Sequence, residues 1–156
     1  MEQTLGRRLY LGQRAVSDEL DRRLREHGAS LWNWVLLREA EHADGLSQRE
    51  LADVMRIEPP TLVRHLDKLS EDGLVERRRD PEDRRVVRVV VTPAGRERQA
   101  QLHQVVHDFD VELRAALSPQ QVEVLGDALT RLYEHFGTGR IENEKQKEEV
   151  GGGHEH

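Results

Sequence analysis

The sequence contains no cysteine, few aromatic residues and no long apolar run. The missing cysteine excludes disulfide bonds and thiolate chemistry, and it favours a reducing compartment. No apolar stretch approaches the length of a membrane span. The N-terminal segment also lacks an apolar core followed by a small-residue cleavage site, so we expect no export signal. We therefore expect a cytoplasmic protein that does not associate with a membrane.

The motifs of enzymes are missing as well. The sequence has no glycine-rich phosphate loop, no nucleophile elbow and no dense cluster of acidic residues or histidines. We therefore expect a protein that is not an enzyme, has no catalytic residues and requires no cofactor.

The composition predicts a thin core. Hydrophobic residues make up 36% of the 156 residues and charged residues 35%, with a formal net charge of -6. The length suits one compact domain, but so many charged residues leave little to bury in it. A large interface with a second copy would supply the missing burial.

Helical periodicity dominates the first part of the chain. The apolar residues of the first helix share one stripe that stops near His27-Gly28, namely Leu5, Leu9, Val16, Leu20 and Leu24. The next helix, from Ser30, is apolar on nearly every side, as a central helix would be, and Gly45 ends it.

Two shorter helices follow. Ser47 and Glu50 form a capping box, which predicts a helix that runs to about Met55. The prolines after Glu58 open a second helix at about 59–72, because proline is tolerated in the first helical turn.

Beyond Gly73 the apolar period changes from helical to alternating. Residues 74–79 and 85–91 are rich in β-formers and are joined by the turn-favouring segment 80–84. This pattern predicts a two-stranded hairpin over about 74–91, and it carries six arginines.

Proline also marks the helix starts in the last third of the chain. Thr92-Pro93 and Ser118-Pro119 each combine an N-cap residue with proline at the first helical position. The last helix has one apolar face, formed by Val122, Leu125, Leu129, Leu132 and Phe136. The predicted organisation is an N-terminal helix at 1–30, a helix-turn-helix with a hairpin at 31–96, C-terminal helices at 97–137 and a weakly docked charged tail at 138–156.

Charge is distributed unevenly along this plan. Residues 56–96 contain ten basic and eight acidic residues, a net charge of +2, so the remainder of the chain carries -8. A helix, a tight connection, a second helix and a charged hairpin together make a winged helix-turn-helix, and positive charge gathers where DNA would lie.

The segment from Glu50 to Arg96 resembles the DNA-binding lobe of the MarR/SlyA family of bacterial transcription regulators. The hairpin motif Asp-x-x-Asp-Arg-Arg, followed seven residues later by Thr, is the most distinctive part of the match and falls on Asp80, Asp83, Arg84, Arg85 and Thr92. The resemblance implies a mainly α fold with a small β-hairpin wing, dimerised through its N- and C-terminal helices. It also implies a homodimeric repressor or activator of transcription that binds a near-palindromic double-stranded operator.

The resemblance assigns DNA contacts to the second helix and to the wing. Residues that would face base edges and phosphates are Pro60, Thr61, Arg64 and His65, and Arg64 is the first candidate for a guanine contact. Arg85 would enter the minor groove, braced by Asp83. Phosphate ligands would be Lys68, Arg77, Arg78, Arg79, Arg84 and Arg88. The connection at Arg56 lacks the glycine that is common in such turns.

A small-molecule effector is also implied. Family members bind phenolic or aromatic carboxylates in a crevice beside the winged lobe, where this chain offers Trp32, Trp34, Arg14 and Arg38. Packing in the core is the alternative role for either tryptophan.

Two other functions remain open at this point. His103 and His107 have the helical spacing of a metal-binding pair, and His42 could join them in a zinc-responsive regulator of the same fold. The winged helix could also bind an acidic protein partner instead of DNA. Solvent exposure is the simpler role for each histidine.

Overall fold

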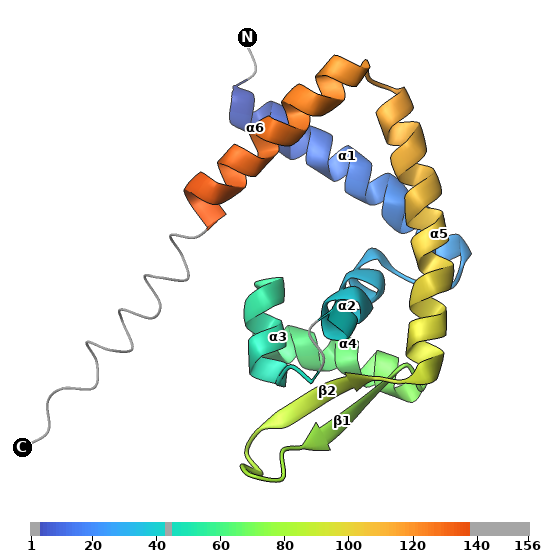
Figure 1. Cartoon of the computed structure of the whole chain (residues 1–156), viewed down its shortest axis with the longest axis vertical. Helices are drawn as coiled ribbons and strands as arrows, with labels where there is room; N and C mark the ends of the chain where they lie inside the picture. Colours follow the sequence, from blue (N-terminus) through green and yellow to red (C-terminus); the bar gives the residue numbers. More distant parts are fainter. Residues whose placement is uncertain (1–3, 43–44, 138–156) are drawn as a thin grey trace, which may run out of the picture. The chain divides into compact units, whose positions relative to one another are not determined.

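The computed structural model describes residues 4–42 and 45–137. The elements run in the order α1 (Leu5–Glu26), α2 (Leu31–His42), α3 (Gln48–Met55), α4 (Pro59–Glu71), β1 (Val75–Arg79), β2 (Val87–Val91), α5 (Pro93–Ala115) and α6 (Pro119–Gly137). They are drawn in Figure 1. The chain divides into two compact units, residues 1–109 and 110–156, with the boundary inside α5. The tail predicted at 138–156 lies outside the described residues.

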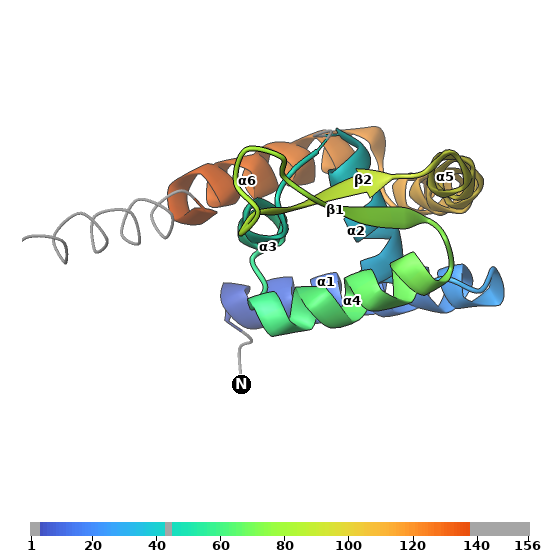
Figure 2. The same cartoon turned by 90° about the horizontal axis from the view of Figure 1, so that it is seen from below.

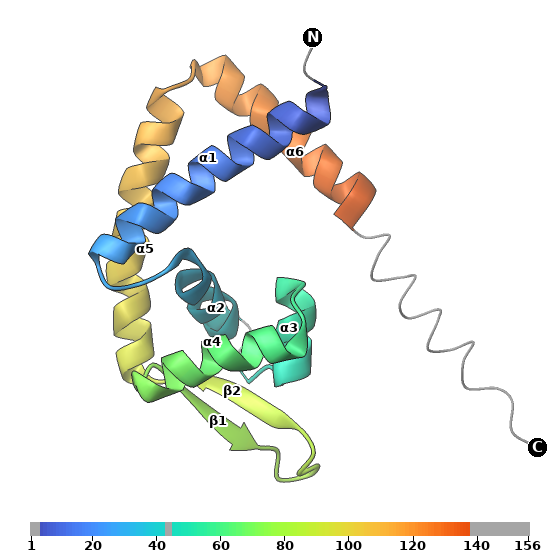
Figure 3. The ribbon, with the colours of Figure 1, turned by 180° about the vertical axis from the view of Figure 1, so that it is seen from behind.

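The expected mainly helical fold with a β-hairpin wing is confirmed. Strands β1 and β2 form a two-stranded antiparallel sheet, in which Val75 pairs with Val91 and Arg79 with Val87. Helix α4 contacts β1, and α2 contacts α3, α4 and β2. Figures 2 and 3 show α3, α4 and the hairpin gathered around α2. We call this part, residues 31–91, the winged lobe.

Local signals in the sequence place the helix ends. The Thr4 hydroxyl caps α1 by accepting from the backbone N–H of Arg7, and Gly28 follows its C-terminal end with a φ of 71°. Both halves of the capping box at α3 are present, since Ser47 accepts from the N–H of Glu50 and the Glu50 carboxylate accepts from the N–H of Ser47. These side chains satisfy backbone donors that a helix start leaves unpaired.

The turn between α3 and α4 carries strain. Arg56 caps α3 with a φ of 53°, in the left-handed region that favours glycine. It is the one described residue other than glycine with a positive φ. The missing glycine noted in the sequence is therefore replaced by an arginine in the conformation that glycine would adopt, at a cost of about 1 kcal/mol or more.

A leucine-rich core holds the winged lobe together. Its fully buried members come from α2, α3, α4 and both strands, and include Leu37, Leu51, Leu62, Leu66 and Val89. A second cluster joins α1, α2 and α5 through Leu24, Trp34 and Leu102. The predicted central position of α2 is confirmed, because α2 contributes to both clusters.

The start of the second strand was predicted too early. The sequence pattern placed it at Arg85, whereas β2 begins at Val87. Asp83 is the reason, because its carboxylate accepts the backbone N–H of Arg85 and its carbonyl accepts that of Val86. These hydrogen bonds keep Arg85 in the turn.

The junction between the hairpin and α5 is tight. The Thr92 hydroxyl accepts from the N–H of Gly95 and donates to the carbonyl of Gly73, as expected of an N-cap. A Cβ at Gly95 would lie 2.0 Å from the carbonyl oxygen of Leu74 and 2.7 Å from a methyl carbon of Val91. Only glycine allows α5 to approach the hairpin this closely.

Helix α6 has the predicted apolar stripe, in which Val122 and Leu132 are half-buried and the other three residues are exposed. Leu125, Leu129 and Phe136 are 46%, 43% and 69% exposed, and the only buried residue of the helix is Gly137. The sequence placed these residues on a core face, and in a single chain they lie at the surface. None of the described helices is long and apolar enough to cross a membrane.

Candidate nucleic-acid interface

Helix α4 buries one side and leaves the other open. Leu62, Leu66 and Leu69 are fully buried, which directs Arg64 and Lys68 outwards to the exposed face. Pro60 is also exposed, and Thr61 beside it is half-buried, at the N-terminal end of the helix. That end carries the positive pole of the helix dipole and suits an anion such as phosphate.

His65 lies at the edge of this exposed face. Its ring stacks on that of Trp32 from α2, with centroids 5.7 Å apart and planes inclined by 23°. Trp32 is 45% exposed. The structure therefore brings together a predicted DNA contact and a predicted ligand contact, which the sequence had assigned to separate sites.

Helix α4 is joined to the hairpin by an ion pair. The guanidinium of Arg77 lies 2.7 Å from the carboxylate of Asp67 on α4. Arg77 was predicted to bind phosphate, and in the structure its guanidinium is paired with Asp67. This bridge fixes the first strand of the wing against the helix that would read the bases.

Arg85 stands at the tip of the wing with its brace in place. Its Nε and one terminal nitrogen each donate to Asp83 at 3.1 Å, and its side chain is 90% exposed. The hydrogen bond from the Arg85 side chain, followed by the one from its backbone, lowers the pKa of Asp83 below its usual value of 3.8. The carboxylate thus stays charged and holds the guanidinium in a fixed orientation.

The other hairpin arginines differ in how they are held. Arg78 pairs with Glu76 at 2.6 Å, while Arg79 donates to the backbone carbonyl of Arg84 at 2.9 Å. Arg78, Arg79 and Arg84 are all exposed. Lys68 is likewise exposed and pairs with Asp72 at 3.1 Å on its own helix. Exposed pairs of this kind are weak, so these cations are available to phosphate.

Arg88 has a different environment, which no sequence pattern indicated. Its Nε donates to Asp80 at 2.5 Å and its Nη1 donates to the carbonyl of Gly45 at 3.0 Å. Asp80 was not among the predicted site residues, apart from its place in the wing motif. Because Gly45 lies 43 positions away along the chain, no local pattern could have revealed this contact.

The four predicted effector residues are not gathered at one place. Trp34 is buried, its Nε1 has no hydrogen-bond partner, and the Arg38 guanidinium lies 5.5 Å from its ring centroid. Trp32 instead stacks on His65. Arg14 makes its contacts within α1, where Tyr10 and Asp18 raise the pKa of its guanidinium.

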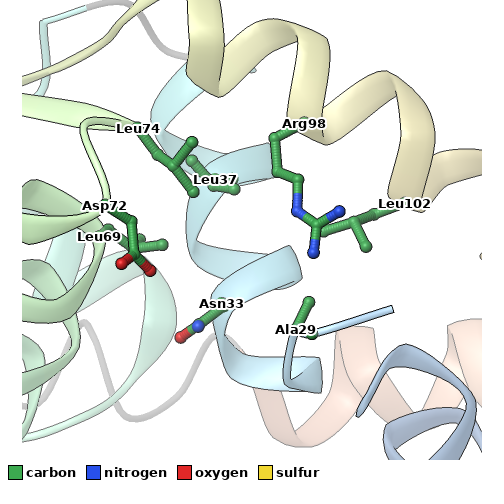
Figure 4. Close-up of a pocket in the computed structure, with 9 residues that line it drawn as sticks. Ala29, Asn33, Leu37, Leu69, Asp72, Leu74, Arg98 and Leu102 are labelled. Carbon is green, nitrogen blue, oxygen red and sulfur yellow. The ribbon is translucent and has the colours of Figure 1, made fainter. Parts of the chain in front are cut away.

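A small pocket of about 210 Å³ lies beside α2, which lines it with Asn33 and Leu37. Leu37, Leu69 and Leu102 contribute apolar surface, whereas Asn33, Asp72 and Arg98 contribute polar groups. Figure 4 shows Arg98 reaching in from α5, opposite Asp72. The Arg98 guanidinium also donates to the carbonyl of His27, so it closes the C-terminal end of α1.

The histidines do not form a metal site in the part of the chain that the structure describes. No group of three or more His, Cys, Asp or Glu residues there could hold a metal ion. His42 lies at the C-terminal end of α2, and His103 and His107 lie on α5 with exposed side chains. The described residues therefore offer no ligand set for the zinc-responsive alternative.

Comparison with known proteins gives matches over the same lobe. Residues 30–87 match the MarR family model. An uncharacterised HTH-type transcriptional regulator of Bacillus subtilis (strain 168), YdgJ, is 37% identical over 91 residues. That match covers 58% of this chain and 56% of the relative, so it spans just over half of the relative's length.

Solved structures match over most of the chain. Wild-type MarR from E. coli in its apo form is 28% identical, with a TM-score of 0.75 over 85% of this chain and 98% of that one. A mutant MarR from E. coli complexed with operator DNA is 29% identical, with a TM-score of 0.75 over 82% and 92%. The transcriptional repressor CouR, bound to a 23-mer DNA duplex, is 25% identical, with a TM-score of 0.78 over 83% and 92%.

The helix pair α3–α4, followed by an arginine-rich hairpin, defines a winged helix-turn-helix protein. The lobe matches the MarR family model, and the fold agrees with MarR structures over most of the chain, so the chain is similar to regulators of the MarR family. The resemblance predicted from the wing motif is thereby confirmed.

Proposed function

We propose that the protein is a homodimeric transcriptional regulator that binds double-stranded DNA sequence-specifically and acts as a repressor. One observation carries this proposal. Arg64 on the exposed face of α4 and Arg85 at the tip of the wing both project from the winged lobe, which a single buried core holds together. Residues 56–96 carry a net charge of +2, whereas the remainder of the chain carries -8. This difference in charge would orient the lobe towards DNA.

Each element of the lobe has a task in this proposal. Helix α4 enters the major groove, where the Arg64 guanidinium can pair with O6 and N7 of guanine. The wing extends to the neighbouring minor groove, which Arg85 enters. Thr61, Lys68, Arg78 and Arg84 bind phosphates, which set the affinity and its dependence on salt but carry no sequence information.

The proposed dimer is supported by apolar surface at both ends of the described chain. On α1 the exposed residues are Leu5, Leu9, Tyr10 and Leu11, and on α6 they are Val124, Leu125, Leu129, Tyr133 and Phe136. Monomeric proteins rarely leave large apolar side chains exposed in rows. A second copy covering these helices would supply the burial that the composition lacks, and would present two recognition helices to the operator.

We further propose that a small phenolic or aromatic carboxylate lowers the affinity for DNA. Trp34 supports this, because its buried Nε1 lacks a partner and the Arg38 guanidinium lies over its ring. A ligand that prefers a dimer geometry unsuited to DNA would weaken binding by its difference in affinity for the two states. The test is operator binding with a series of hydroxybenzoates; indifference to all of them would contradict this part.

Selection of bound duplexes from a randomised DNA pool tests the proposal as a whole. We expect the enriched sequences to share a near-palindrome with half-sites about one helical turn, or 34 Å, apart. Enrichment without a common sequence would contradict specificity. Failure to retain any duplex would favour the alternative in which the winged lobe binds an acidic protein partner.

A further inference from the structure

The base of the wing contains an ion pair that the proposed DNA contacts do not use. We propose that Asp80 and Arg88 are positioning residues, which hold the tip of the wing so that Arg85 can enter the minor groove. This inference rests on the proposed function and adds two residues that act through Arg85. It also gives Arg88 a role other than the phosphate contact predicted from the sequence.

Asp80 organises the turn of the wing with both carboxylate oxygens. Oδ1 accepts the backbone N–H groups of Glu82 at 2.8 Å and Asp83 at 3.2 Å. Oδ2 accepts from Nε of Arg88 at 2.5 Å. The side chain of Asp80 is only 13% exposed, far less than that of Arg85. One carboxylate thus ties the first half of the turn to the second strand.

Arg88 continues the connection beyond the hairpin. Its Nη1 donates to the carbonyl of Gly45, in the segment between α2 and α3. The same segment pairs with β2 through a bridge between Ser47 and Arg88 and through the N–H of Val89, which donates to the carbonyl of Leu46 at 2.8 Å. The wing is therefore fastened to the helix-turn-helix at its base as well as to β1.

The need for such a fastening follows from the size of the wing. A two-stranded hairpin alone is marginally stable, so its tip would sample many orientations. Asp83 orients the Arg85 guanidinium, and its own backbone N–H donates to the carboxylate of Asp80. The chain of contacts from Gly45 through Arg88 and Asp80 to Asp83 therefore ends at the group that would enter the groove.

The same geometry explains why charge alone is insufficient at Arg88. Its Nε and Nη1 donate to two acceptors on different segments, which requires the planar fork of a guanidinium. A lysine would keep the positive charge but has one ammonium nitrogen on a flexible stem. A phosphate ligand would tolerate that replacement far better, because phosphate is bound well by either cation.

The decisive variant is therefore Arg88→Lys, with Arg131→Lys on α6, an exposed position outside the winged lobe, as the matched control. Asp80→Asn serves as the second variant, since it removes the charge but keeps an oxygen for the backbone N–H groups. Duplex affinity is measured at several salt concentrations with the full chain. Amide hydrogen exchange is measured without DNA at Glu82, Asp83 and Val89.

We expect Arg88→Lys and Asp80→Asn each to lower duplex affinity about tenfold, and the double variant to lose little more, because both residues belong to one connection. The slope of log affinity against log salt should stay unchanged in Arg88→Lys, since the charge is kept. Exchange at the three amides should quicken about tenfold in both variants. Arg131→Lys should leave affinity and exchange unaltered.

Two results would overturn the inference while leaving the proposed function intact. If the Arg88→Lys protein binds duplex as tightly as the unchanged protein, the two-pronged guanidinium of Arg88 is not needed. Weaker binding with unaltered amide exchange would mean that Arg88 contacts DNA directly. Absence of duplex binding by the unchanged protein would instead overturn the proposed function, and the inference with it.

Discussion

The winged lobe and the terminal helices differ in how they bury their apolar residues. The lobe encloses leucines from α2, α3 and α4 in a core of its own and leaves charge on its surface. In α6 three residues of the apolar stripe, Leu125, Leu129 and Phe136, are exposed, and α1 exposes Leu5 at 77%. A helix with such a face is stable in a protein only when something packs against it.

This difference separates two tasks within one chain. The lobe has the core it needs to hold α4 and the wing in fixed positions, so its surface is free to carry arginine. The terminal helices leave apolar residues exposed on their surface, and this surface suits packing against a second copy of the chain. The comparison predicts that substitutions in the two regions impair different properties: dimer formation in the terminal helices, and stability or DNA affinity in the lobe.

The largest expected effect comes from the terminal helices. Placing glutamates at both positions in a Leu125→Glu, Leu129→Glu variant should prevent dimer formation, because charge would be buried without a partner. Light scattering should give a mass of 18.0 kDa in place of twice that value. Duplex affinity should fall by at least about a hundredfold, since only one half-site is bound at a time.

Arg131→Glu is the control for this variant. It adds the same negative charge to an exposed position of α6 away from the apolar stripe. We expect it to remain a dimer. A Leu125→Glu, Leu129→Glu protein that still has twice the mass of the chain would contradict the account of α6.

Substitution of a buried leucine in the winged lobe should lower the stability of the protein. Leu66 is fully buried on α4, so Leu66→Ala should lower the free energy of unfolding by about 3 kcal/mol through lost burial and the cavity that remains. Urea unfolding measures this directly. Val54→Ala, at a position of α3 that is 52% exposed, should cost less than about 0.5 kcal/mol. Equal losses in the two variants would argue against a closed core.

The wing tip should affect binding without affecting stability. The Arg85 side chain is 90% exposed and is held by Asp83, a residue of the same turn, so Arg85→Ala should leave the free energy of unfolding unchanged. It should weaken duplex binding by about 1–3 kcal/mol. Arg131→Ala on α6 removes an equal charge outside the lobe and should have little effect. Unchanged affinity in Arg85→Ala would refute the groove contact.

The smallest expected effect is the response of the wing to acid. The hydrogen bond from Arg88, followed by those from the N–H groups of Glu82 and Asp83, lowers the pKa of Asp80 below its usual 3.8. A lowered carboxyl pKa stabilises the fold above the unfolded value, and the contribution is lost as pH falls through the folded value. Wing amides should thus stay protected at neutral pH and lose protection below about pH 3.8. Loss of protection already near pH 6 would contradict the assignment to Asp80.

The local parts of the fold were predictable from the sequence. The capping box at Ser47, the proline starts at Pro93 and Pro119, and the change of apolar period after Gly73 each act within a few residues. The same holds for the Asp83–Arg85 brace, whose members are two positions apart. Such signals reflect backbone hydrogen bonding that is settled locally.

Contacts between distant segments were not predictable in this way. Nothing near Arg88 indicates Gly45 as a partner, and nothing near Trp32 indicates a stack on His65. The sequence showed only that the turn at Arg56 lacks a glycine. The left-handed backbone conformation of Arg56 could not be predicted, because it is imposed by the packing of α3 against α4. These features depend on tertiary structure, which a single sequence does not display.

The central claim is that the winged lobe binds DNA through its arginines, and a titration at varied salt tests it most directly. Fluorescence anisotropy would follow binding of the purified protein to duplex from the region upstream of its own coding sequence, with scrambled duplex as competitor. We predict tight binding that resists the competitor and weakens steeply with salt, at about 0.9 units of slope for each phosphate contact. Binding that is indifferent to salt, or no preference over scrambled duplex at any salt concentration, would contradict the account.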